Sequence, residues 1–574
     1  MSTILEQYLE EKKIASQFRQ NKTVNWLLNE QLYNGVVSPS VLTKSNIHFP
    51  KLFDGVQTMS ARIGVMPEID FDVKPEGDEN AADLMNGLWK YDTRRNELDQ
   101  LADFSKIEAG LYGRAIFKFI PDNENPHFEL LDTLSFLISP LGTNPQKAPF
   151  ATQQFIYKTI QQLEDEADKM GYDKKVIKRL KKLQSDVYGQ TNQDASQRNL
   201  RLAYMGFPNT IQLGQKNIEI SEHYTVIDGE KHILTIALDK EILRDIKLSE
   251  IGLKDWPFFS WGSFTRSVSF WVPSVADVLR DPNLAQDVIA NQIIDNNTYT
   301  NFGMIFADSA SGIKQGSIIP RPLGVTSVNT SGKAVKDAVW QYTPPPITSG
   351  AAMLSLIENT ALQAAGLTPP SGMGGRMNAS MLAQQMALLE ERTRLMKASY
   401  YACFRDMAQC YADFTSKKLT SPRDVKIFGQ KQLTITGVTK ENFKGVNFIS
   451  KTIDPESSQQ NKAIKQKAII ELYNLYKDDP KVPGQIYLRE KVAREFGFNP
   501  TEIDKLMSQE ENPNPQPQPG APGVPGVPGG QAPSSAPYTN GANPVVSEAQ
   551  MNAQNNVPPS IQPIASPKQA ITMK

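Results

Sequence analysis

The sequence predicts a multidomain α+β protein built around unusually long helices. Three observations lead to this fold class. The chain has 574 residues, which is too long for a single hydrophobic core. Through its first half, short runs of alternating polar and apolar residues, typical of strands, are interspersed with helical patterns. Beyond the middle, one helical pattern continues from Ala379 for roughly 36 residues, or about 54 Å.

The N-terminal half contains most of the predicted strands and reads as a mixed domain that ends near residue 262. Apolar residues at helical spacing predict helices over residues 2–33, 51–63 and 79–111. The highly charged residues 159–186 also predict a helix. Strands are expected at residues 68–74, 114–120, 127–131, 218–220, 223–227 and 232–238.

Two helices that flank a β-rich insertion come next. In the first, over residues 272–301, Pro273 suits the first helical turn, whereas Pro282 should kink or restart the helix. Residues 302–347 contain β-prone runs cut by glycine and proline, which indicates a small, loop-rich β module. The second helix should end at Gly366, because glycine readily takes the left-handed conformation of a C-cap.

The Gly/Pro-rich residues 367–378 cannot sustain helix or sheet, so they predict a loop before the long helix. A helix of this length with a loop at its end favours a scaffold over a catalytic pocket. Its expected buried face consists of Leu382, Met386, Leu389, Met396, Tyr400, Cys403, Met407, Tyr411 and Phe414.

The end of the chain changes character twice. Residues 425–428 and 432–436 predict a hairpin, and residues 455–508 predict two or three short helices. Residues 509–574 are rich in proline, glycine and glutamine and offer too few apolar residues for a core, so we expect this tail to be disordered.

Charge and cysteine content limit the classes of function. The formal net charge of −1 gives no overall field for tight nucleic-acid binding, so any DNA contact should be local or weak. Cys403 and Cys410 lie seven residues apart on one helix, about 10 Å, which is too far for a disulfide. We expect buried thiols. Without an apolar run that spans a membrane or a signal pattern, the chain is expected to be soluble and to have no membrane partner.

Motifs for catalysis, cofactors or metals are absent from the sequence. Gly332, Lys333 and Ala334 lack the upstream glycine and the hydroxyl of a phosphate-binding loop. We therefore expect no enzyme activity, no cofactor and no metal site. The histidines show no second ligand at metal spacing and should have structural roles: His48, His127, His223 and His232.

Two features offer local positive charge. The basic block over residues 174–182 has either a role in attracting DNA phosphates or, with the acidic residues just upstream, the role of a plain solvated face. Arg376 is the single charge of the loop over residues 367–378, where it either cradles an anion or belongs to an ordinary connection.

The order of parts resembles the portal (head–tail connector) proteins of tailed bacteriophages, particularly those of podoviruses. Residues 270–297 carry the most specific match. They look like the family's stem motif, in which an aromatic residue precedes Pro273 and Ser274, acidic residues follow at Asp277 and Asp281, and a run of Asn and Asp ends the segment. The loop over residues 367–378 stands where that family has its tunnel loop. The resemblance covers roughly residues 1–508.

This resemblance implies the family's anatomy. The wing would comprise residues 1–271 and 379–455, and the stem helices residues 272–301 and 348–366. The clip would be residues 302–347, the tunnel loop residues 367–378 and the crown residues 456–508. The chain departs from the family in its Pro-rich tail and in lacking a recognisable barrel after the crown.

The resemblance also implies function, location and partners. The chain would form a homo-dodecamer at one capsid vertex of a virion, after assembly in the host cytoplasm. Double-stranded DNA would pass through its channel, and its other partners would be the large terminase, the major capsid protein and scaffold, and head–tail adaptors. The implied channel residues are Arg376, Asn378, Ser371 and Met373. The implied clip contacts with DNA, motor or adaptor are Lys314, Arg321, Lys333 and Lys336.

Two other hypotheses remain open from the sequence. One is a different self-assembling virion scaffold, such as a minor head or tail protein, that has no DNA channel. The other is an enzyme whose site has no recognisable motif. A ring with an open channel, an assembly without one, and a monomer with a deep polar pocket distinguish the three.

Overall fold

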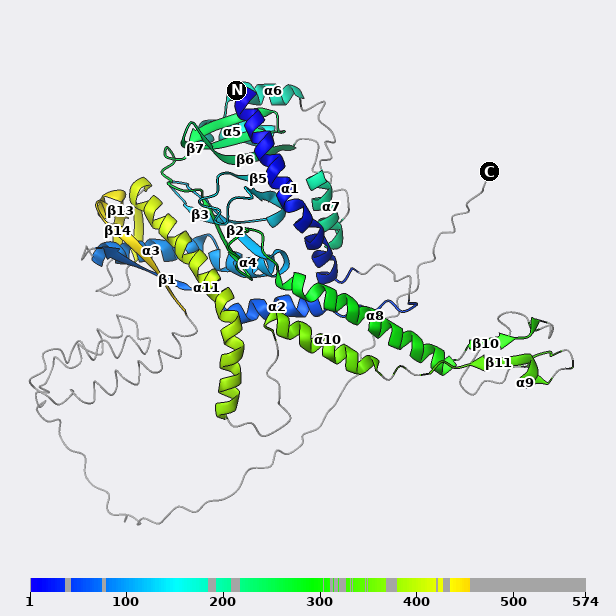
Figure 1. Cartoon of the computed structure of the whole chain (residues 1–574). Helices are drawn as coiled ribbons and strands as arrows, with labels where there is room; N and C mark the ends of the chain where they lie inside the picture. The colour runs from blue at the N-terminus through cyan, green and yellow to red at the C-terminus, as the bar shows by residue number, and fades with distance from the viewer. Residues whose placement is uncertain are drawn as a thin grey trace, which may run out of the picture. The chain divides into compact units, whose positions relative to one another are not determined.

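Figure 1 shows the computed structural model of the protein. The chain forms two units, Met1–Glu510 and Glu511–Lys574, and every described residue belongs to the first. The predicted short helices over 455–508 and the tail therefore lie outside the described residues. The structure describes residues 2–36, 43–74, 79–183, 193–207, 217–302, 304–309, 313, 318, 327–330, 332, 334–345, 347, 349–367, 379–419, 422–426 and 434–454.

Four helices begin the fold. Helices α1 (Ser2–Tyr33) and α2 (Lys51–Ile63) have the bounds that the sequence predicts. The helical stretch predicted over residues 79–111 is confirmed, and the structure divides it into α3 (Glu79–Arg95) and α4 (Leu98–Tyr112). Between them Glu97 adopts a left-handed conformation, with φ of 52°. The apolar spacing continues across this turn, so the pattern carried no sign of the break.

Antiparallel strands pack against three of these helices: β1 against α3, β2 against α4 and β4 against α1. The predicted bounds of β1 (Glu68–Lys74), β2 (Arg114–Ile120) and β3 (His127–Leu131) are confirmed. One sheet has the order β3-β2-β9 and another the order β4-β5-β6-β7-β8. The remaining strands are β4 (Phe136–Ile138), β5 (Ala151–Thr159), β6 (Asn217–Ile227), β7 (Glu230–Ala237), β8 (Glu241–Lys247) and β9 (Phe258–Gly262).

The structure contains more strands, and longer ones, than the sequence predicts. The two short strands predicted at residues 218–220 and 223–227 are one strand, β6, and the third corresponds to β7. Strands β4 and β9 are buried almost throughout, so they lack the polar–apolar alternation that marks a half-exposed strand. Strand β14 (Asn447–Ile453) was also missed, and it pairs with β1 from the other end of the described chain.

The helical stretch predicted over residues 159–186 is likewise divided into two helices, and its first residue belongs to a strand. Thr159 ends β5 and caps α5 (Ile160–Met170) through a reciprocal capping box with Gln162. Gly171, with φ of 72°, then ends α5, and α6 (Lys174–Leu183) follows. A further helix, α7 (Gln193–Tyr204), precedes β6.

The long helix α11 (Ala379–Lys418) has 40 residues and supports the core. The predicted apolar face is buried from Met396 to Phe414. The side chains of Leu382, Met386 and Leu389 lie outside the description. Three edge-to-face ring pairs join α11 to the β2–β9 sheet, with centroid separations of 4.9 Å (Tyr400–Trp261), 5.6 Å (Phe404–Phe117) and 5.3 Å (Phe414–Phe119).

Two packed helices lead to a hairpin, as Figure 1 shows. They are α8 (Val275–Phe302) and α10 (Gly350–Ala365). Helix α8 continues through Pro282, so the predicted restart is wrong, although proline cannot donate the usual helical hydrogen bond. The predicted β module is confirmed as an antiparallel pair with a short helix between its strands. Its parts are β10 (Met304–Ala307), α9 (Val335–Ala338) and β11 (Val339–Tyr342).

The second predicted hairpin is confirmed as well. Strands β12 (Arg423–Lys426) and β13 (Thr434–Val438) pair antiparallel, with a register shift between Arg423 and Val425.

A buried charge cluster in the five-stranded sheet predicts acid sensitivity. Burial opposes ionisation of Glu222, but Lys118, 2.6 Å away, and Arg244 outweigh it and hold the pKa of Glu222 at about 2, below the ordinary 4.5. Because the folded pKa is depressed, the stability from this group is complete above about pH 4.5 and is lost as pH falls toward 2. Glu222→Gln should remove on the order of 3 kcal/mol at neutral pH. Denaturant titrations should therefore give free energies of unfolding that differ at neutral pH and converge in acid for the unmodified protein and Glu222→Gln.

Candidate functional site

The start of α8 explains the Pro-Ser-x-x-Asp motif. Asp277 N–H donates to Ser274 Oγ at 2.8 Å, and Ser274 N–H donates to Asp277 Oδ2 at 3.1 Å. This reciprocal pair is a capping box that fixes the first turn of the helix. Pro273 lies before the helix rather than in its first turn. Gly113, the C-cap of α4, packs so closely here that a Cβ would meet Val272 O at 2.4 Å.

A row of Asn and Asp side chains along α8 binds the segment that precedes α2, and Asp295 of this row begins the run of Asn and Asp that ends the stem motif. Four side chains spaced four residues apart form a row along the helix: Asn283, Asp287, Asn291 and Asp295. They bind the backbone of residues 43–50, which we call the strap, and of Leu52. Asn291 pairs with both the N–H (2.8 Å) and the carbonyl (2.9 Å) of Ile47. Asp287 accepts from Phe49 N–H at 2.9 Å and Asp295 from Ser45 N–H at 3.0 Å. The row therefore binds mainly the backbone of the strap, and it also contacts the side chains of Ser45 and His48.

Other contacts hold α10, and the residues just before it, against α8 and α2. Asn296 Nδ2 donates to Pro345 O at 3.2 Å, so α8 also holds the extended chain that leads into α10. At the start of α10, a Cβ on Gly350 would meet Ile293 Cδ1 at 2.6 Å, which explains the small residue. Lys51 of α2 donates to Glu358 of α10 at 2.5 Å.

The exposed surface of α10 includes large apolar side chains. Met353 and Leu356 of α10 are 53% and 67% exposed. The hairpin continues this character, with Phe306 and Trp340 exposed and their rings stacked at 5.4 Å. A two-stranded hairpin is marginally stable alone, and exposed apolar surface of this kind marks an interaction site.

Of the four predicted clip cations, one lies among the described residues. Lys336 lies on α9 with its side chain exposed, beside the aromatic residues of the hairpin. Lys314, Arg321 and Lys333 lie outside the described residues.

The predicted channel residues also lie outside the described residues: Arg376, Asn378, Ser371 and Met373. The chain is described up to Leu367, which is buried, and Gly366 caps α10 in a left-handed conformation as predicted. Arg62 of α2 donates to the carbonyls of Gly366 (2.9 Å) and Leu367 (3.3 Å). Sequence reasoning missed Arg62, because a lone arginine on a helix carries no sign of a distant carbonyl partner.

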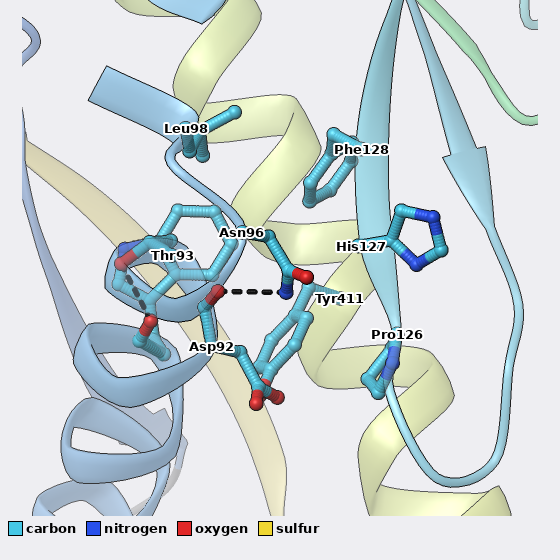
Figure 2. Close-up of a pocket in the computed structure, with 9 residues that line it drawn as sticks. Asp92, Thr93, Asn96, Leu98, Pro126, His127, Phe128 and Tyr411 are labelled. Carbon is cyan, nitrogen blue, oxygen red and sulfur yellow. Dashed lines mark hydrogen bonds between the residues drawn. The ribbon is translucent and has the colours of Figure 1, made fainter. Parts of the chain in front are cut away.

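A buried carboxylate on α3 binds side chains of α11 and β12, and Figure 2 shows it beside Tyr411 of α11. Asp92 of α3 accepts from the Tyr411 hydroxyl and from Arg423 of β12, both at 2.6 Å. Its Oδ1 has no hydrogen-bond partner among the described residues, and Asp92 lines a cavity of about 10 Å³, the size of one water molecule. Burial raises the pKa of Tyr411 well above its ordinary value, so the hydroxyl remains a donor.

The histidines all bind partners within the chain, as structural roles require. His48 Nδ1 lies 2.6 Å from Asp287, and His232 Nδ1 lies 2.7 Å from Asp245. His127 contacts the Asn125 carbonyl, and Glu129 raises its pKa. Burial lowers the pKa of His223, which bonds to Glu11 and Thr152.

The basic block on α6 has acidic partners. Lys174, Arg179 and Lys181 pair with Asp168, Glu241 and Glu164, while the apolar residues of the helix pack inward. This arrangement favours the solvated-face hypothesis over DNA binding. Of the cysteines, Cys403 is buried and Cys410 is partly exposed, both are free, and burial raises both thiol pKa values.

One large polar cleft is relevant to the enzyme hypothesis. It has a volume of about 800 Å³ and is lined by Lys118, Lys158, Glu166, Glu222 and Arg244 among others. Lys118 pairs with Glu222, and Lys158 pairs with Glu166, so these charges are used within the fold. Across the described parts of the chain, no group of three or more His, Cys, Asp or Glu side chains could hold a metal ion. Nor do those parts include a helix long and apolar enough to cross a membrane.

With this geometry in view, comparison with known families gives one result. A family model described as phage SU10 portal protein matches residues 87–436, more than half of the chain. The chain belongs to this family of tailed-phage portal proteins. Comparison with curated proteins gives no match.

Family membership confirms the resemblance drawn from the sequence. The chain is thus a structural protein of the bacteriophage virion, and the family is not an enzymatic one. The matched residues include α8, the hairpin and α10.

Proposed function

We propose that this chain forms a dodecameric ring at one vertex of the capsid. The ring is the channel through which double-stranded DNA is packaged and ejected. Its clip binds the large terminase first and the head–tail adaptor afterwards, and its outer parts contact the major capsid protein and scaffold. The subunits assemble in the host cytoplasm. We assign the wing, stem, clip, tunnel loop and crown to the residue ranges that the family resemblance implies.

The exposed apolar surface of α10 carries this proposal. Its 16 residues include one charged side chain, Glu358, which already pairs with Lys51. Leu356 is 67% exposed and Met353 53%. At about 25 cal/mol per Å² of apolar surface removed from water, covering such a helix in every subunit favours assembly strongly. A closed ring covers it in all copies without leaving a free end.

The stem also supports a channel for DNA. The row on α8 holds the strap by its backbone, and Lys51 and Asn296 tie α10 and its approach to the same body, so the helical pair is fixed as one rod. The described surface of α10 carries no positive charge. A conduit of this kind lets DNA slide, because phosphate contacts would release counterions and hold the duplex.

The hairpin supports docking. Phe306, Trp340 and Tyr342 form one aromatic cluster with ring separations of 5.4 and 5.8 Å. Aromatic residues are enriched in protein interfaces, and the exposed Lys336 adds a cation for an acidic or phosphate partner. The clip therefore suits exchange between two protein partners.

Replacing Gly374 and Gly375 by valine should leave ring assembly intact but impair DNA packaging or retention. Both glycines belong to the proposed tunnel loop, where β-branched side chains narrow the passage and restrict the backbone. Particle assembly with the double variant, followed by measurement of packaged DNA, tests this. Normally filled particles would contradict the tunnel-loop assignment.

The alternative is a self-assembling virion scaffold without a channel. It shares the exposed apolar surface but predicts a closed or open assembly that has no central hole. Imaging of the assembled protein separates the two.

A further inference from the structure

Acidic side chains surround Arg201, a residue of α7. Arg201 binds Asp132 in bidentate fashion, at 2.6 Å (Nη1 to Oδ1) and 3.0 Å (Nη2 to Oδ2). Its guanidinium lies 5.9 Å from the centre of the Tyr112 ring, and Nη1 lies 3.4 Å from the Tyr112 hydroxyl. Two parallel hydrogen bonds to a carboxylate and an aromatic face are the geometry that a guanidinium prefers.

Two more carboxylates complete the cluster. Glu30 of α1 is 2% exposed and bonds to the Tyr112 hydroxyl. Glu108 of α4 accepts from Thr133 Oγ1 at 3.0 Å. Facing groups thus come from α1, α4, the turn after β3, and α7. Arg19, the other cation on this side of α1, donates instead to the Leu134 and Phe136 carbonyls.

The cluster holds a proton at neutral pH. Burial, and next the charge of Asp132, raise the pKa of Glu108 to about 8, while Arg201 acts in the opposite direction. Burial also raises the pKa of Glu30. The raised pKa values of Glu108 and Glu30 favour their neutral forms, as expected for like charges in a packed interior.

Arg201 is the polar anchor of α7. Among the described side chains of α7, Arg201 is 12% exposed and donates to Asp132 and Tyr112, whereas Leu200 next to it is 41% exposed. Helix α7 packs against α1 at this place. The bidentate contact with Asp132 therefore helps to position α7.

We propose that Glu30, Glu108, Asp132 and Tyr112 form a guanidinium-binding socket, which Arg201 occupies to dock α7, with an affinity that depends on the protonation of Glu108. The socket's ligand class is a guanidinium group, supplied here by the chain itself.

The direction of the pH dependence follows from linkage. The charge of Arg201 lowers the pKa of Glu108, so loss of the Glu108 proton must strengthen guanidinium binding by the same free energy. The socket should bind more tightly above about pH 8 and more weakly below it.

Chemical rescue tests the socket. In full-length Arg201→Ala, millimolar methylguanidinium should raise the melting temperature more than the same concentration of methylammonium. The apparent affinity should increase severalfold, up to ~10-fold, between about pH 7 and about pH 9. In Arg201→Ala combined with Glu108→Gln, methylguanidinium should still bind, but its affinity should no longer change with pH.

Hydrogen exchange of residues 193–207 gives a second readout. Exchange should accelerate in Arg201→Ala and in Arg201→Lys, since a lysine cannot make the bidentate contact. Equal effects of methylguanidinium and methylammonium, or unchanged exchange in both variants, would overturn the proposal. So would a pH dependence that persists without the Glu108 carboxylate.

Discussion

Leu356→Glu should prevent the chain from closing into a ring. Leu356 is 67% exposed on α10, in a helix whose single charged residue is already paired. If neighbouring copies cover this surface, each contact must bury an unpaired carboxylate, which costs several kcal/mol per interface. Because the cost recurs at every interface, rings should fall below detection in size-exclusion chromatography with light scattering.

Leu141→Glu is the matched control, since it makes the same change at a residue between β4 and β5 that is 85% exposed. It should assemble as the unmodified chain does. Rings of normal size and yield from Leu356→Glu would contradict the place of α10 at the subunit interface, and circular dichroism would establish that both variants fold.

Asp287→Ala should release the strap from α8 and destabilise the subunit by about 3 kcal/mol. Asp287 accepts from His48 Nδ1 (2.6 Å), Phe49 N–H (2.9 Å) and Asn283 Nδ2 (3.3 Å). Its removal takes this acceptor from His48 Nδ1 and Phe49 N–H in a site where Asp287 and His48 are both 9% exposed, whereas Asn283 Nδ2 keeps its bond to Phe49 O. Denaturant unfolding at fixed subunit concentration measures the loss, and amide exchange at Ile47 and Phe49 should accelerate.

Asp281→Ala supplies the control on the same helix. Its side chain is 78% exposed and pairs with the adjacent Arg280, so the change should stay within about 0.5 kcal/mol. An equal loss in both variants would indicate general damage to α8. Unchanged exchange of the strap in Asp287→Ala would contradict the role of the row.

The sequence predicted those elements whose local pattern matches their surroundings. Helix α11 was found because one apolar stripe faces the sheet, and β1, β2 and β3 because their bounds coincide with changes of pattern. Elements set by tertiary contacts were missed. Strand β14 depends on β1 for its partner, and Glu97 breaks a helix through one left-handed residue.

The candidate site divides in the same way. The capping box of α8 is local and its residues stood out as a motif, although its physical meaning required the structure. The Asn/Asp row was visible as a composition, yet its four-residue spacing gained meaning only with the strap beside it. Arg62 and Asp92 act on partners distant in the chain, which no local pattern reveals. The tunnel-loop residues stay predictions.

The most direct test of the account is the mass of the purified full-length protein in solution, with electron-microscope class averages of the same sample. The account predicts a closed ring of twelve subunits with an open central channel. A stable monomer, or an assembly without a central hole, would contradict it.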